Sequence, residues 1–102
     1  ESLRVIECLK KSGLEIKEIK QFMDWCQEGS STFEKRRELL GKRREVIRTE
    51  MAEMEHSLDM LNFKYWYYDT AIKDGTDENV LAMFPDKFPD GIQELYNKTH
   101  KS

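Results

Sequence analysis

A seven-residue repeat of apolar side chains between Thr32 and Lys73 constrains the fold of this chain more than any other feature. With Phe33 assigned to heptad position d, all six d positions are apolar, as are three of the five a positions. These apolar positions form the heptad seam: Phe33, Leu40, Ile47, Met54, Leu61 and Tyr68 at d, and Met51, Leu58 and Tyr65 at a. Spacings that alternate between 4 and 3 over five heptads predict one long coiled-coil helix.

A helix of about 40 residues is about 60 Å long, so the short remaining segments are too small to cover the whole seam. We therefore expect a second copy of the chain to cover it. Arg37 and Arg44 occupy the other two a positions, which makes the N-terminal end of the seam weaker. Phe63 and Trp66 lie off the seam and widen the apolar face, where other elements could pack.

Two short helices are predicted ahead of the long one, over Leu3–Lys11 and Glu15–Gln27, and Gly13 and Gly29 follow them in the usual terminating position. Each has an apolar face at helical spacing. The faces comprise Leu3, Val5, Ile6 and Leu9 in the first helix, and Ile16, Ile19, Phe22, Met23 and Cys26 in the second.

A capping box of Ser31 and Glu34 is predicted to start the long helix, with Thr32 as an alternative cap, and Gly75 is predicted to end it. The tail, residues 76–102, is predicted to be largely irregular, with one short helix over 92–98. The fold class is therefore all-α, with two short helices followed by one long helix.

The composition limits the partners of the whole chain. With a net charge of −3 over 102 residues, the chain has no overall attraction to phosphate backbones or anionic membranes, so any nucleic-acid contact needs a local basic segment. No run reaches the roughly 20 apolar residues of a membrane span, and two cysteines without a repeating framework fit a reducing compartment. We expect a soluble cytoplasmic protein with no membrane partner.

The sequence lacks the patterns of an enzyme. His56 is predicted to be a surface residue and His100 to lie near a frayed end, and neither is placed beside a Ser or Cys nucleophile. No glycine-rich phosphate loop, H-E-x-x-H or C-x-x-C is present. We expect no catalytic activity, no metal and no cofactor.

Cys8 has a reason to be reactive, because Arg4 and Lys11 lie about one helical turn before and after it and favour a thiolate. The alternative is an ordinary helix-packing thiol, the role that we also expect for Cys26.

The aromatic run Tyr65-Trp66-Tyr67-Tyr68 allows two interpretations. The rings either pack at the end of the coiled coil or, through Tyr65, Trp66 and Tyr68, form the wall of an effector pocket.

The order of these parts resembles the MerR family of bacterial transcription regulators over about Leu3 to Gly75. The matching segments are Leu3–Lys20, Glu28-Gly29, Thr32, Glu34–Arg36, Leu39-Leu40 and Lys64–Ala71. The resemblance implies a homodimer whose long helices pair antiparallel. It also implies that the dimer distorts the spacer of a promoter, and so affects RNA polymerase indirectly.

In that family a helix-turn-helix and wing come first, and neither precedes Glu1. The resemblance thus makes residues 1–29 the second half of a DNA-binding domain, residues 30–75 the dimerisation helix and residues 76–102 a tail. We expect promoter DNA to be bound through the missing N-terminal segment. Residues 1–102 alone are then expected to dimerise but hardly to bind DNA.

The tail distinguishes branches of the family. Residues 75–102 contain no cysteine, which disfavours the metal-sensing and iron–sulfur branches, and they are too few for a multidrug-binding domain. Cys8 lies where a branch that responds to aldehydes and other electrophiles, a stress response, keeps its sensing cysteine. The inducer, the promoter and the sign of regulation stay open, and the alternative function is a coiled-coil adaptor that does not bind DNA.

Overall fold

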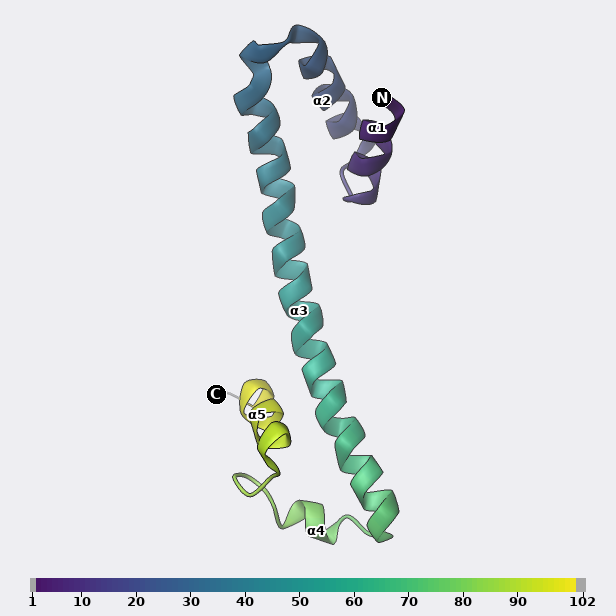
Figure 1. Ribbon diagram of the computed structural model, residues 1–102, viewed down its shortest axis with the longest axis vertical. Coiled ribbons are helices and arrows are strands. Elements are labelled where there is room, and N and C mark those ends of the chain that lie inside the picture. The colour runs from purple at the N-terminus through teal and green to yellow at the C-terminus, as the bar shows by residue number, and fades with distance from the viewer. Residues whose placement is uncertain (1, 101–102) are drawn as a thin grey trace. The chain divides into compact units, whose positions relative to one another are not determined.

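The computed structural model describes residues 2–100 of the chain, and all of its regular elements in that range are helices (Figure 1). The elements are α1 (Ser2–Lys11), α2 (Ile16–Glu28), the 3₁₀ turn η1 (Ser30–Thr32), α3 (Phe33–Asp74), α4 (Glu78–Leu81) and α5 (Asp90–Thr99). The all-α prediction, with two short helices before one long helix, is confirmed. The chain divides into two compact units, an N-terminal unit of residues 1–50 and a C-terminal unit of residues 51–102.

The core of the N-terminal unit is small and lies between α1 and α2. Its buried residues are Leu9, Leu14, Ile19 and Phe22, and the partly buried residues packed against them are Val5, Ile6, Met23, Cys26 and Leu39. Leu39 joins the N-terminal part of α3 to this core. Leu3 and Ile16, which the helical periodicity placed on the same faces, are instead 75% and 79% exposed. They lie in the first turns of α1 and α2, where no other element of this unit covers them.

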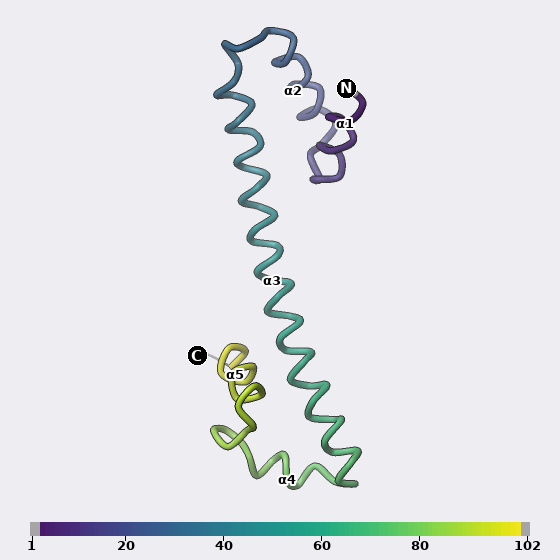
Figure 2. The backbone as a smooth tube through the Cα atoms, viewed as in Figure 1, coloured from purple at the N-terminus to yellow at the C-terminus, as the bar shows by residue number. Residues whose placement is uncertain are grey.

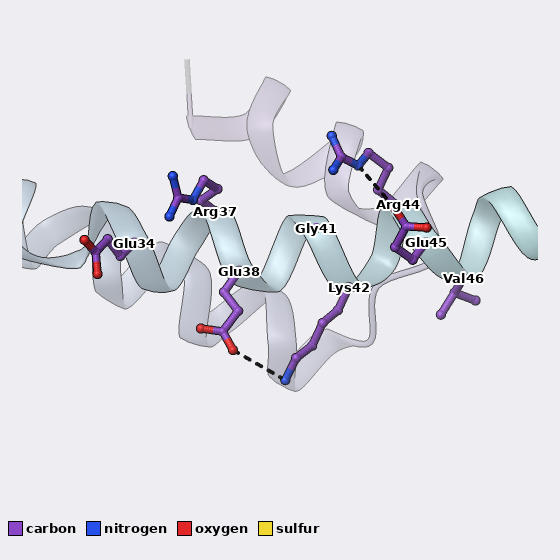
Figure 3. A pocket seen from close by; sticks show the side chains of 8 residues that line it. All are labelled: Glu34, Arg37, Glu38, Gly41, Lys42, Arg44, Glu45 and Val46. Atoms are coloured by element: carbon purple, nitrogen blue, oxygen red, sulfur yellow. Dashed lines mark ion pairs between the residues drawn. The ribbon is translucent and has the colours of Figure 1, made fainter.

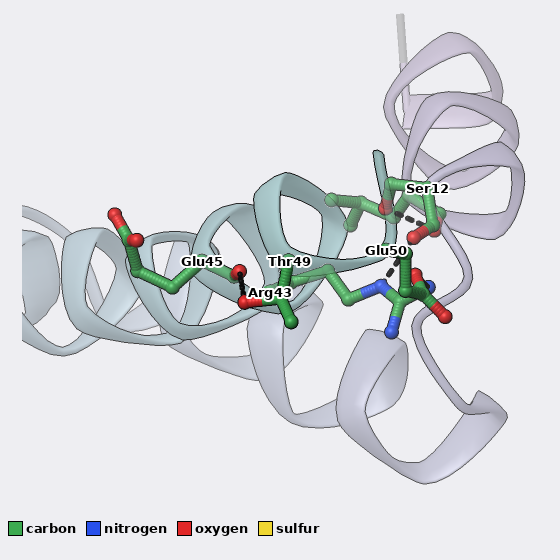
Figure 4. Close-up of polar contacts among 6 residues, drawn as sticks. Ser12, Arg43, Glu45, Thr49 and Glu50 are labelled. Atoms are coloured by element: carbon green, nitrogen blue, oxygen red, sulfur yellow. Dashed lines mark hydrogen bonds and ion pairs between the residues drawn. The ribbon is translucent and has the colours of Figure 1, made fainter. Parts of the chain in front are cut away.

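The turn between α1 and α2 depends on Gly13, whose φ of +88° is in the left-handed region. Its amide donates to the carbonyl of Lys10 at 2.9 Å. Arg43 of α3 lies against the same turn, where its Nε donates to the carbonyl of Ser12 and its Nη2 lies 3.8 Å from Glu50 (Figure 4). This one side chain therefore connects the turn to α3.

The corner between α2 and α3 differs from the predicted capping box of Ser31 and Glu34. Gly29, with a φ of +95°, ends α2 and leads into η1, and the hydroxyl of Thr32 turns inward. Thr32 is 1% exposed, and its hydroxyl lies 2.6 Å from the carbonyl of Trp25 and 2.8 Å from that of Gly29. Arg36 donates to the Thr32 hydroxyl at 3.0 Å. The residue that stabilises this corner is therefore buried Thr32, the alternative cap, and not exposed Ser31.

The C-terminal unit is built around aromatic rings. Phe63 of α3 is 2% exposed, and its ring centroid lies within 6.0 Å of five other rings. These neighbours are Trp66, Phe84, Phe88, Tyr96 and His100. The prediction that other elements pack against Phe63 and Trp66 is confirmed.

The tail contains more helix than its sequence suggested. The short helix predicted over 92–98 is confirmed as α5, and α4 is an additional single turn with Val80 fully buried. Within this unit the chain reverses through α4, and α5 returns beside the C-terminal part of α3 (Figure 2). Aromatic packing on Phe63 orders the tail, and that packing cannot be read from the local residue pattern of the tail.

Candidate dimerisation and DNA-binding surfaces

The heptad seam is uncovered in the single chain. Eight of its nine residues are among the exposed large apolar side chains, from 41% exposed at Leu40 to 76% at Tyr65, and Ile47 is half-buried. The other exposed members are Phe33, Met51, Met54, Leu58, Leu61 and Tyr68. A continuous apolar stripe of this extent marks an interaction surface.

A charged hollow lies on α3 around Gly41 in the N-terminal unit (Figure 3). Its volume is about 750 Å³, and it is lined by Glu34, Arg37, Glu38, Gly41, Lys42, Arg44, Glu45 and Val46. A Cβ atom added to Gly41 would meet no other atom within 4 Å, so the floor of the hollow is open. Exposed ion pairs join residues of its lining, Lys42 with Glu38 at 3.9 Å and Arg44 with Glu45 at 4.0 Å. Such pairs contribute little to stability and can rearrange when a partner binds.

An aromatic hollow of about 410 Å³ lies on the seam in the C-terminal unit. It is lined by Leu61, Lys64, Tyr65, Tyr68, Asp69 and Ile72. Two residues of the predicted effector pocket, Tyr65 and Tyr68, are therefore brought together. The third, Trp66, does not line this hollow and packs instead on Phe63 and Phe88, at 6.0 and 5.8 Å between ring centroids.

Ile72 also belongs to the seam but was not predicted there. In the structure its side chain is 78% exposed. It occupies the next a position after Tyr65, so continuing the heptad by one more step would have found it.

Cys8 is exposed on α1, beside buried Leu9. Arg4 and Lys11 are also exposed on this helix. Cys26 is half-buried, and its Sγ accepts a hydrogen bond from Arg36 at 3.6 Å. The two thiols therefore differ in access to reagents, and Cys8 is the accessible one.

Charge is distributed unevenly along the chain, which its net charge conceals. Residues 1–50 carry 12 Lys and Arg against 10 Asp and Glu, whereas residues 51–102 carry 5 against 10. Four exposed lysines lie on α1 and α2: Lys10, Lys11, Lys17 and Lys20. The N-terminal unit is thus the part of the chain that suits contact with phosphate groups.

Tyr67 joins the last part of α3 to the start of α4. Its hydroxyl donates to Oδ2 of Asp77 at 2.6 Å. This hydrogen bond, strengthened by the negative charge of the carboxylate, raises the pKa of Tyr67 to about 12.

The histidines and acidic residues form no site among the residues described. His56 is exposed, and His100 stacks on Tyr96 with 4.1 Å between ring centroids, so His100 is packed rather than frayed. Between residues 2 and 100, no group of three or more His, Cys, Asp and Glu side chains is placed to hold a metal ion. No helix in that range is both long and apolar enough to cross a membrane.

Comparison with known proteins gives a family. The sequence profile described as "MerR, DNA binding" matches residues 1–62. An HTH-type transcriptional regulator of Haemophilus influenzae is 32% identical over 69 residues, which cover 68% of this chain and 51% of the relative. The chain therefore spans about half the length of this curated relative. No solved structure matches the chain.

The match corrects one prediction. DNA binding was expected to need a helix-turn-helix and wing ahead of Glu1, and the DNA-binding part was therefore expected to be missing. The matched DNA-binding profile instead lies within this chain, over α1, α2 and α3 as far as residue 62. The match agrees with the predicted relation to DNA-binding regulators. The chain belongs to the MerR family of DNA-binding proteins.

Proposed function

We propose that the chain acts in a transcriptional regulator that binds promoter DNA as a homodimer. The observation that carries the proposal is a match to a DNA-binding family over residues 1–62, a range that includes seven of the nine residues of the uncovered heptad seam. The relative described as an HTH-type transcriptional regulator supports the regulatory role. Such a protein would work in the cytoplasm, where bacterial DNA lies.

The energetics of the seam support dimerisation. Burying a large apolar side chain fully contributes about 1.5–3 kcal/mol, and the seam repeats in both copies. Losing the freedom of two separate molecules costs about 4–15 kcal/mol. Burial of most of the seam in both copies exceeds this cost, so a stable dimer is expected.

The two arginines in the seam favour antiparallel pairing. In a parallel, in-register coiled coil each a position faces its own copy, so Arg37 would face Arg37 and Arg44 would face Arg44. Two layers of facing like charges are unfavourable. Antiparallel pairing removes both layers, and it places the basic half of one copy beside the acidic half of the other.

DNA contact is assigned to the N-terminal unit, whose exposed lysines on α1 and α2 suit the phosphate backbone. An antiparallel pair of long helices would hold two such units apart on one promoter. Binding both half-sites would then bend or twist the spacer between them, and RNA polymerase would respond to the altered DNA without touching the regulator.

Two features are candidates for signal sensing. The first is Cys8, whose exposed thiol is open to aldehydes and other electrophiles, as in a stress response. The second is the aromatic hollow with Tyr65 and Tyr68, which has the apolar lining of a small-molecule site and would bind its effector in competition with the second copy of the chain. A Cys8→Ser variant that still responds fully to an electrophile would remove the first candidate.

The experiment that tests the function is a footprint of the protein on the DNA upstream of its own gene, with and without a reactive aldehyde. Protection across a promoter spacer, with hypersensitive bands that change on aldehyde treatment, would support the regulator and point to Cys8. Protection that ignores the aldehyde would support the regulator alone. A dimer that protects no DNA would instead favour the coiled-coil adaptor, because an exposed seam can also dock another helix.

A further inference from the structure

We propose that two copies pair in a single register, in which Met51 of each copy faces Met54 of the other, and that the charged hollow of one copy receives Tyr65 and Tyr68 of its partner. The inference rests on the proposed homodimer. It adds the register, and it assigns a role to the two arginines and to Gly41.

The register follows from the seam positions themselves. In an antiparallel coiled coil each a position faces a d position of the other helix. Including Ile72, α3 carries six a and six d positions, and one alignment pairs them all. The pairs are Phe33 with Ile72, Arg37 with Tyr68, Leu40 with Tyr65, Arg44 with Leu61, Ile47 with Leu58, and Met51 with Met54.

Sliding the helices by one heptad leaves part of the seam uncovered. In one direction Phe33 and Arg37 lose their partners, and in the other direction Tyr68 and Ile72 do. Phe33, Tyr68 and Ile72 are 61%, 60% and 78% exposed in the single chain. Each slide therefore leaves large apolar surface in water, which costs about 25 cal/mol per Å².

This register also gives both arginines a partner other than an arginine. Arg37 faces Tyr68, whose exposed ring can accept a cation–π contact from the guanidinium. Arg44 faces Leu61, over which its aliphatic stem can lie while the guanidinium reaches solvent. Arg37 and Arg44 line the charged hollow, whereas Leu61 and Tyr68 line the aromatic hollow. The two hollows of opposite copies thus close over each other.

Gly41 leaves room for a tyrosine ring of the second copy in the charged hollow. It follows Leu40, which faces Tyr65, and its missing side chain leaves the floor of the charged hollow open (Figure 3). Glycine in a helix interior costs about 1 kcal/mol relative to alanine. In the single chain nothing occupies the space that this glycine leaves. A ring from the second copy would fill it and offset that cost.

The test is to measure distances between spin labels placed at the same position in both copies. Lys42, Thr49 and His56 are exposed and lie seven residues apart on the face opposite the seam. Each is changed to Cys in turn in the full chain, with Cys8→Ser and Cys26→Ala as background. The background variant must keep the dimer mass of the unchanged protein.

The proposed register places Thr49 and His56 equally far from the two-fold axis, so their labels should give the same distance. Along the helix axis, that separation is about 10 Å for each, against about 31 Å for Lys42, at about 1.5 Å per residue. Equal distances at all three positions would mean parallel pairing. Unequal distances at Thr49 and His56 would mean a slide by a heptad. Either result overturns the register but leaves the footprint test of the regulator untouched.

A second variant tests the hollow. Gly41→Leu should raise the dimer dissociation constant at least tenfold, because its side chain occupies the space meant for the partner's tyrosine, while the helical signal stays the same. Thr49→Leu, at an exposed position opposite the seam on the same helix, is the matched control and should dimerise normally. Normal dimerisation of Gly41→Leu would show that the hollow receives no ring.

Discussion

At the residue scale, Gly13 is tightly constrained for two separate reasons. Its φ of +88° suits glycine, and a Cβ atom there would collide with the guanidinium of Arg43. We expect Gly13→Ala to lower the free energy of unfolding by at least about 1–2 kcal/mol, the cost of the left-handed conformation for a residue with a side chain.

Gly91 provides the control for this substitution. It lies in the first turn of α5, and an added Cβ atom there meets nothing within 4 Å. Gly91→Ala should therefore be neutral or slightly stabilising. Urea unfolding of both variants is the measurement, and a Gly13→Ala variant as stable as Gly91→Ala would contradict the expectation.

Also at the residue scale, the Tyr67–Asp77 hydrogen bond predicts alkaline sensitivity. The pKa of Tyr67 is about 12 in the folded chain, against an ordinary value of 10. Because the pKa of Tyr67 is raised in the folded chain, the stabilisation by the Tyr67–Asp77 hydrogen bond is complete below pH 10. It is lost as the pH rises from 10 to 12.

The check is the free energy of unfolding measured between pH 9 and 12. Tyr67→Phe removes the titrating hydroxyl and should show a shallower fall with pH than the unchanged protein. Asp77→Asn, which removes the charged acceptor of this hydrogen bond, should show the same shallower fall. Identical slopes in all three proteins would rule out the proposed contribution.

At the scale of elements, α3 has two faces that are covered differently. The face with Phe63 is covered by α5 and its neighbours in the C-terminal unit, whereas the seam face is left open. The arginines on the open face weaken the seam but distinguish one pairing from another, as a polar residue at an a position does in other coiled coils.

Replacing both arginines should separate those two effects. With Arg37→Leu and Arg44→Leu together, we expect a dimer at least tenfold tighter, because the four layers that contain an arginine become apolar. We also expect parallel pairs to form beside antiparallel ones, giving the Lys42 label a second, shorter distance. A tighter dimer with one unchanged distance would show that the arginines do not select the orientation.

At the scale of the whole molecule, the sign of the charge changes along the chain. The N-terminal unit carries an excess of basic residues and the C-terminal unit an excess of acidic ones, so DNA contact should depend on the first and not on the second.

Charge reversal on α2 tests this division. Lys17→Glu with Lys20→Glu should lower affinity for promoter DNA at least tenfold and reduce the steepness of its salt dependence, because two phosphate contacts become repulsive. Lys73→Glu with Lys98→Glu changes the net charge equally in the C-terminal unit and should have a much smaller effect. Equal losses from both pairs would assign the binding to overall charge alone.

Helix positions and the seam could be predicted because they depend on local spacing. Apolar residues at 4 and 3 intervals, together with Gly13, Gly29 and Gly75, gave bounds close to those of α1, α2 and α3. The uneven distribution of charge could also have been found from the sequence, by counting the charged residues of the two halves separately. The exposed seam could be predicted because all of its residues lie on one helix, and its role as a dimer interface stays a prediction.

The sequence by itself determined the all-α class, the long helix and its exposed seam, since each depends on residues within a few turns of one another. Tertiary structure decided the rest. Helix spacing places Trp66 off the seam, but only the tertiary structure packs it on Phe88. Thr32 is buried at the corner, where its hydroxyl hydrogen-bonds with the carbonyls of Trp25 and Gly29. The tail is ordered by contacts with Phe63, far away in the sequence. Such contacts depend on which segments meet in space, and the local periodicity of a sequence does not show which distant segments contact one another.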